Sequence, residues 1–85
     1  MKEKRNTTQM PVIKILDSIK IYMYFFDHNP PHFHAIYDEY QELIIIETLE
    51  TYSGSIPNKQ RKKVIEWAQE NKDYLNKKWE EYNPQ

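Results

Sequence analysis

The sequence contains no cysteine and only one glycine among its 85 residues. Without cysteine, disulfide bonds and thiolate metal ligands are excluded, a composition typical of proteins in the reducing cytoplasm. The longest apolar runs are far too short to cross a bilayer, and no signal-peptide pattern opens the chain. We therefore expect a cytoplasmic protein with no membrane partner, and the length predicts a single small domain.

The chain also lacks a large excess of charge of either sign. Twelve Lys and Arg oppose 13 Asp and Glu, which gives a formal net charge of -1. Residues 11–56 are acidic, whereas residues 57–85 are mildly basic. A dedicated DNA-binding module needs a strongly basic surface, so this composition argues against one. It leaves room for a protein that contacts RNA through a few phosphates.

Short segments with a β pattern occupy the first half of the chain. Residues 1–9 are polar and aperiodic, which predicts a disordered tail before a single α+β domain over residues 10–83. Runs rich in β-branched and aromatic residues, separated by turn signals, predict four strands at residues 12–17, 19–27, 32–38 and 42–49. Because the connections between them are short, we expect a four-stranded antiparallel β-meander.

The apolar spacing changes from two residues to three or four after Pro57. Proline at the first turn favours a helix start, and the new spacing is that of an amphipathic helix. Polar residues around Asn71 predict a kink or a break. The fold class is therefore α+β, with one long kinked helix or two helices packed on one face of the sheet. The apolar stripe of this helical region comprises Val64, Ala68, Leu75, Trp79 and Tyr82.

All three histidines lie in one stretch, FFDHNPPHFHAIY, at residues 25–37. His32 and His34 are two residues apart on a predicted strand, so their side chains leave the same face. The alternate residues then belong to the core, and we expect the two histidines on an open or cleft-like side. The rigid Pro-Pro loop would bring His28 over them. The residues assigned to the core by this alternation are Phe33, Ala35 and Tyr37.

Three interpretations of the cluster follow from the residues alone. The first is a divalent metal such as zinc held by His28, His32 and His34, with Asp27 as a fourth ligand or as the group that orients His28. The second is metal-free acid–base cleavage of RNA by paired imidazoles, with Tyr37 or a lysine stabilising phosphate charge. The third is a purely structural role. All three remain open at this stage.

Basic residues gather where the helical region begins. Their side chains could contact RNA phosphates, or they could simply form a solvated helix face. The candidates for RNA binding are Lys59, Arg61, Lys62 and Lys63.

The motif at residues 27–37, together with IETLE at 46–50 and EWA at 66–68, resembles one small bacterial family of unknown function. This family has an Asp-His-x-Pro-Pro-His-x-His-Ala core, and the resemblance extends over about residues 10–82. Many members are regarded as the toxin half of type II toxin–antitoxin pairs. In this sequence Met10 stands where chains of the family begin, so translation could start at Met1 or Met10. The resemblance marks as the functional surface Asp27, His28, Pro30, Pro31, His32, His34 and Tyr37.

The resemblance implies a toxin-like protein. The histidine chemistry adds the hypothesis that it binds RNA and cleaves it with His28, His32, His34, Asp27 and Tyr37. The resemblance also implies a small antitoxin-like partner that covers this face. Two other readings stand beside it: a non-catalytic protein-interaction module, and a small His-rich metal-binding domain. One departure bears on the chemistry, because relatives frequently carry a carboxylate where this chain has an isoleucine at position 45.

Overall fold

The computed structural model describes residues 11–84, so the predicted tail at residues 1–9 lies outside the described residues. These residues form a five-stranded antiparallel sheet followed by two helices, which confirms the α+β class. Each strand pairs with the next along the chain, in the order β1-β2-β3-β4-β5. The strands are β1 Val12–Leu16, β2 Ile19–Tyr22, β3 His32–Tyr37, β4 Tyr40–Ile45 and β5 Thr51–Ser55.

The prediction of four strands is wrong by one. Residues 51–55 pair with β4 as an edge strand, although they are exposed along their whole length and show no apolar alternation. Their glycine, Gly54, has φ 74°, a backbone conformation that residues with a Cβ rarely adopt. Two strands also differ from the prediction by more than one residue: β2 stops at Tyr22 instead of residue 27, and β4 covers residues 40–45 instead of 42–49.

The two short turns of the meander follow ordinary turn chemistry. Asp17 and Asp38 begin the connections between β1 and β2 and between β3 and β4, and both have positive φ, 55° and 53°. Aspartate tolerates this left-handed conformation better than most residues. The register between neighbouring strands is therefore set partly by the turns.

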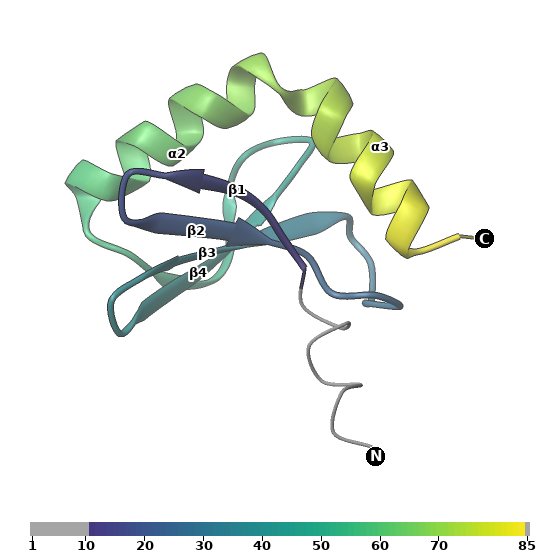
Figure 1. Ribbon diagram of the computed structural model, residues 1–85, viewed down its shortest axis with the longest axis horizontal. Helices are drawn as coiled ribbons and strands as arrows, with labels where there is room; N and C mark the ends of the chain where they lie inside the picture. Colours follow the sequence, from purple (N-terminus) through teal and green to yellow (C-terminus); the bar gives the residue numbers. More distant parts are fainter. Residues whose placement is uncertain (1–10, 85) are drawn as a thin grey trace.

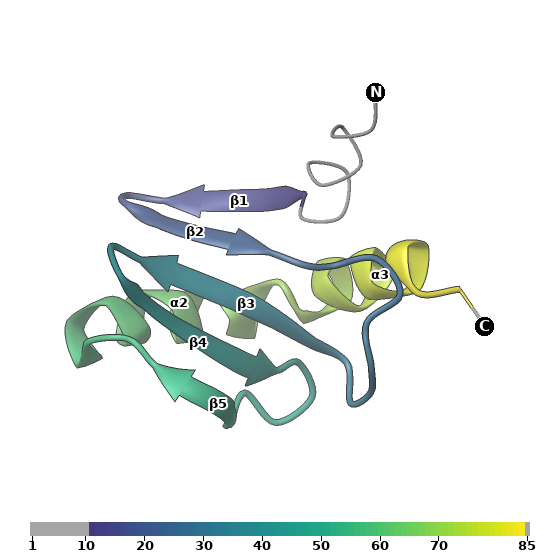
Figure 2. The same cartoon turned by 90° about the horizontal axis from the view of Figure 1, so that it is seen from below.

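The helical region forms two helices, α2 (Asn58–Glu70) and α3 (Lys72–Tyr82). The break falls at Asn71, where the sequence predicts it. The side-chain Nδ2 of Asn71 donates a hydrogen bond to the Trp67 carbonyl. Both helices lie on the same side of the sheet, and α3 extends beyond it toward the connection between β2 and β3 (Figures 1 and 2). Neither helix of the described chain has the length and apolar character needed to cross a membrane.

The core lies between the sheet and these helices. Phe33 and Ala35 of β3 are fully buried there, as the alternation along this strand predicts, and Tyr37 packs at its margin. Burial of this apolar surface is the main force that holds the two layers together. The helices contribute to the core Val64, Ala68, Leu75 and Trp79.

Candidate functional site

The site is built by strand β3 and by the β2–β3 loop, residues 23–31, which carries Asp27 and His28. The loop leaves β2, passes beside α3 and returns to the start of β3 (Figures 1 and 2). Its Asn29–Pro30 peptide bond is cis. The path of the loop brings a carboxylate and an imidazole back to the strand that carries the other two histidines.

His32 and His34 share one face of β3, as their spacing predicts, but that face is closed. Their side chains are 0% and 5% exposed. The expectation of an open or cleft-like side is therefore wrong for these two rings. The prediction failed because strand alternation gives the face of a side chain but not what covers that face.

Asp27 is the group that the loop places against the two buried rings. Its Oδ2 atom lies 3.1 Å from His32 Nε2 and 3.5 Å from His34 Nε2. Its Oδ1 atom accepts a hydrogen bond of 2.8 Å from the His28 backbone N–H. The carboxylate is only 12% exposed, so it belongs with the histidines rather than with the solvent.

The tautomer of His32 follows from its other nitrogen. His32 Nδ1 lies 2.7 Å from the Pro30 carbonyl oxygen, and a carbonyl can only accept, so Nδ1 carries the hydrogen and donates. In the neutral ring Nε2 then has a lone pair. That atom is buried and has no hydrogen-bond partner among the described residues, although Asp27 Oδ2 is close to it. Two acceptors in contact are unfavourable unless a cation or a proton lies between them.

His34 lies among aromatic rings. Tyr22, its partner across the β2–β3 pairing, stacks on it with centroids 5.5 Å apart, and the Tyr24 ring meets it edge-on at 4.4 Å. Burial is the largest influence on the imidazole and lowers the pKa of His34, while the Asp27 carboxylate opposes this shift only in part. Burial, together with Tyr24, raises the pKa of Tyr22 to about 12, so its phenol stays protonated.

Asp27 favours its ionised form although it is partly buried. Burial is the largest single influence and would raise the pKa of Asp27. The His28 backbone N–H, the charge of His32 and the hydrogen bond with His34 together outweigh it, so the pKa of Asp27 lies below its usual value. At neutral pH the site therefore contains an anionic oxygen beside two imidazole nitrogens.

His28 lies over His32 at the exposed edge of the cluster, as the sequence predicts, whereas Tyr37 is separated from it. The His28 side chain is 62% exposed, and its Nε2 lies 3.6 Å from Asp27 Oδ1. Its ring stacks on the outer side of the cluster, 5.3 Å from the His32 centroid. Tyr37 packs against the core on the opposite face of β3 and does not reach the histidines. Asp27 thus contacts His28, as the sequence predicts, and it also approaches His32 and His34.

The donor set suits a metal ion. One atom each from Asp27, His32 and His34 can be chosen so that all three lie within 4.8 Å of one another. Two ligands of a tetrahedral zinc ion, each 2.0–2.1 Å from the metal, are about 3.3 Å apart. The distances of 3.1 and 3.5 Å from Asp27 Oδ2 to the Nε2 atoms of His32 and His34 are close to that separation between two ligands. The bond from His32 Nδ1 to a carbonyl is also the usual way in which a ligating imidazole is oriented.

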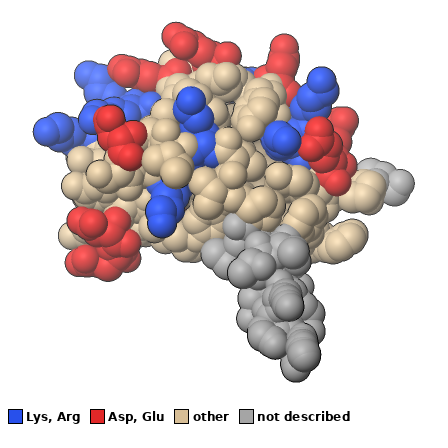
Figure 3. All heavy atoms as spheres, viewed as in Figure 1, with Lys and Arg blue, Asp and Glu red and all other residues tan. Residues whose placement is uncertain are grey.

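The basic residues predicted to bind RNA divide into two kinds. Arg61 Nε donates to Glu42 Oε2 at 2.8 Å, and Lys63 Nζ to Asp17 Oδ2 at 2.7 Å. Lys59 and Lys62 are exposed. Over the described part of the face shown in Figure 3, Lys and Arg are interspersed with Asp and Glu, so this face does not form a continuous basic surface.

Two contributors to the site and its frame were missed in the sequence. Glu42 is fully buried on the core side of β4. It lies two residues before the inward-facing Ile44, and this spacing on a strand could have indicated that Glu42 also faces the core. Asn83 is buried near the end of the chain and binds the backbone of Asp27, and no pattern in the sequence connects these two residues. Ile45 pairs with His32 and lies on the same face, so an isoleucine does stand beside the site.

Comparison with known proteins places the chain in a family. A family model described as a domain of unknown function, DUF4160, matches residues 18–80, which include every strand residue from β2 to β5 and all three candidate ligands. No curated protein and no solved structure matched the chain. Because the match extends over well more than half of the sequence, the chain belongs to the DUF4160 family, whose function is unknown.

Proposed function

We propose that this domain binds a divalent first-row transition metal ion, such as zinc or ferrous iron, through Asp27, His32 and His34. The observation that carries the proposal is the state of His32. Its Nδ1 is satisfied by a carbonyl, and its buried Nε2 lies 3.1 Å from a carboxylate oxygen, so a proton or a cation has to lie between these two atoms. A metal ion can take the place of that proton and accept a lone pair from each atom.

Two imidazoles and one carboxylate form a ligand set that occurs in catalytic zinc sites and in non-haem iron sites. Three protein ligands leave at least one coordination position for water or for a substrate atom. A metal in such a site supplies Lewis acidity and lowers the pKa of bound water. The least buried of the three ligand side chains is Asp27, so solvent reaches the cluster most readily at this residue.

Metal-free RNA cleavage by the histidines has less support. A general acid or base has to lie within hydrogen-bond distance of the substrate proton that it transfers. The side chains of His32 and His34 are almost entirely buried, and the exposed His28 has no second exposed histidine beside it in the described structure. The buried arrangement favours a small ion over a polynucleotide as the direct ligand of these rings.

Metal titration of protein purified without a polyhistidine tag tests the proposal. We expect one equivalent of zinc or cobalt(II) to bind. We also expect Asp27→Asn and His34→Gln to weaken binding by about 100-fold or more, because each removes one of three ligands. His28→Gln is the informative comparison, since the sequence alone placed His28 in the ligand set. We expect less than a tenfold effect there.

Two outcomes would contradict the proposal. Uptake of less than about a tenth of an equivalent by the wild type would refute a metal site. A loss in His28→Gln as large as that in Asp27→Asn would refute the assignment of the ligands. Circular dichroism of each metal-free variant is the control for folding.

The toxin-like role in a two-protein pair stays a prediction that rests on the resemblance. Its test is expression of the wild type and of His34→Gln without any partner, with growth and cellular RNA followed over time. Growth arrest with loss of RNA in the wild type alone would connect the role to the Asp27, His32 and His34 cluster. Normal growth in both would favour an interaction module.

A further inference from the structure

The C-terminal end of α3 holds the β2–β3 loop at the point where the loop carries Asp27. The Phe26 N–H donates to the Tyr82 carbonyl at 3.1 Å, and the Asp27 N–H donates to Asn83 Oδ1 at 2.5 Å. The Phe25 ring also packs on the Tyr82 ring, with centroids 4.6 Å apart. Three consecutive loop residues are thus attached to two consecutive residues at the end of the helix.

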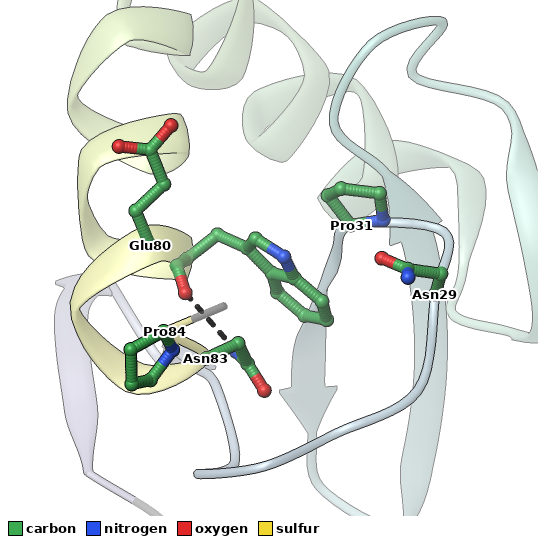
Figure 4. Close-up of a pocket in the computed structure, with 6 residues that line it drawn as sticks. Asn29, Pro31, Glu80, Asn83 and Pro84 are labelled. Carbon is green, nitrogen blue, oxygen red and sulfur yellow. Dashed lines mark hydrogen bonds between the residues drawn. The ribbon is translucent and has the colours of Figure 1, made fainter.

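The Asn83 side chain is oriented by a second bond of its own. Its Nδ2 atom donates to the Trp79 carbonyl at 3.1 Å, so its Oδ1 atom is the one that faces Asp27. The residue is buried. Figure 4 shows Asn83 beside Pro84 at the end of α3, across a pocket from Asn29. An amide held at both ends in this way has little freedom to move with the loop.

Asp27 depends on this support more than the two histidines do. His32 and His34 lie on a central strand that pairs with β4, and His34 pairs with β2 as well. Asp27 lies on the loop between β2 and β3, where the backbone is not held by the hydrogen bonds of a β-ladder. The hydrogen bond from its own backbone N–H to Asn83 is therefore one of the few contacts that position its carboxylate.

We infer that Asn83 is a positioning residue for the metal ligand Asp27, an inference that rests on the proposed metal-binding function. Asn83 does not touch the cluster; it acts through the backbone of Asp27. It lies 56 residues from Asp27 and beyond residues 18–80, the part of the chain that the family model matches. Groups that orient ligands from outside the coordination sphere commonly change metal affinity by about 10–100-fold.

The test compares the wild type with Asn83→Ala. Asn76→Ala is the matched control, because it removes the same amide from an exposed position on α3, the helix that Asn83 caps. Zinc affinity is measured by competition with a chelator, and the visible absorption spectrum of the cobalt(II)-loaded protein reports the geometry at the metal. We expect Asn83→Ala to weaken zinc binding by about 10–100-fold and to change the cobalt spectrum. Asn76→Ala should leave both unchanged.

The possible results separate the inference from the proposed function. A wild type that binds no metal would overturn both. A wild type that binds metal, with the same affinity and cobalt spectrum in Asn83→Ala, would overturn the inference alone. A merely structural role would lower the melting temperature but leave the spectrum of the fully loaded variant unchanged, which also overturns it. Should Asn83→Ala not fold, Asn83→Ser takes its place with the same expectations, since serine is too short to reach the Asp27 N–H.

Discussion

Glu42, which is buried, and Arg61, which is partly exposed, form an ion pair that we expect to be a major contributor to the stability of this domain. Glu42 lies on β4 and faces α2, with its side chain fully buried. Its carboxylate accepts hydrogen bonds from Arg61 Nε at 2.8 Å, from the Ile56 N–H at 3.1 Å and from the Thr51 hydroxyl. The pair thus ties β4, the start of β5 and α2 together.

Replacing Arg61 with methionine keeps an apolar side chain of similar length and removes the cation. Breaking a buried ion pair by removing one partner costs about 3–5 kcal/mol, because the other charge stays buried and unpaired. The Arg61 side chain is 32% exposed, so water already weakens this pair. We therefore expect the lower end, a loss of about 3 kcal/mol in the free energy of unfolding. For a domain of this size that corresponds to a fall in melting temperature of about 12–24 °C.

Thermal unfolding followed by circular dichroism is the assay. Lys62→Met is the control, because it removes one positive charge from the neighbouring exposed position of the same helix. We expect a change of less than about 0.5 kcal/mol there. A double variant, Glu42→Gln with Arg61→Met, should recover part of the loss, since no unpaired charge remains. A melting temperature of Arg61→Met within about 3 °C of the Lys62→Met value would refute the reasoning.

Two further predictions concern the sheet and its surface. Gly54→Ala should lower the free energy of unfolding by about 2 kcal/mol or more in urea, since an alanine there keeps φ 74° and its Cβ would lie 2.2 Å from the carbonyl oxygen of Gln41. A loss below about 0.5 kcal/mol would contradict this. Lys63→Met should raise the pKa of Asp17 toward its ordinary value, because the hydrogen bond from Lys63 and then its charge lower it. The stabilisation from this pair is present above the unfolded pKa and lost as the pH falls through the depressed folded pKa, so the variant should be less sensitive to acid. Carboxyl-carbon NMR titration measures the shift, and an unchanged Asp17 would argue against the pair in solution.

Much of the fold could be predicted from local patterns. Runs of β-branched and aromatic residues identified β1 and β3, the change of spacing after Pro57 identified the helices, and polar residues identified the break at Asn71. These signals are local, because a strand repeats every two residues and a helix every 3.6. The strand β5 carries no such signal. Its five residues are all exposed, and they form a strand only because β4 offers an edge to pair with.

The end of β2 shows the same difference. The apolar run from Met23 to Phe26 reads as a continuation of the strand, yet the strand stops at Tyr22. Met23 and Phe25 are apolar because they pack as loop residues, Met23 in the core and Phe25 against Tyr82 of α3. An apolar run therefore does not determine the backbone conformation, and Phe26 of this same run is exposed.

For the candidate site, the sequence by itself determined that His32 and His34 share one face and that Phe33 lies on the other. Only the tertiary structure decided that this face is closed, that the Asp27 carboxylate approaches both imidazoles, and that Asn83 binds the backbone of Asp27. The physical reason is that the direction of a side chain follows from the backbone of its own strand. What it meets depends on how a nine-residue loop and the end of a helix 56 residues further along the chain pack against that strand.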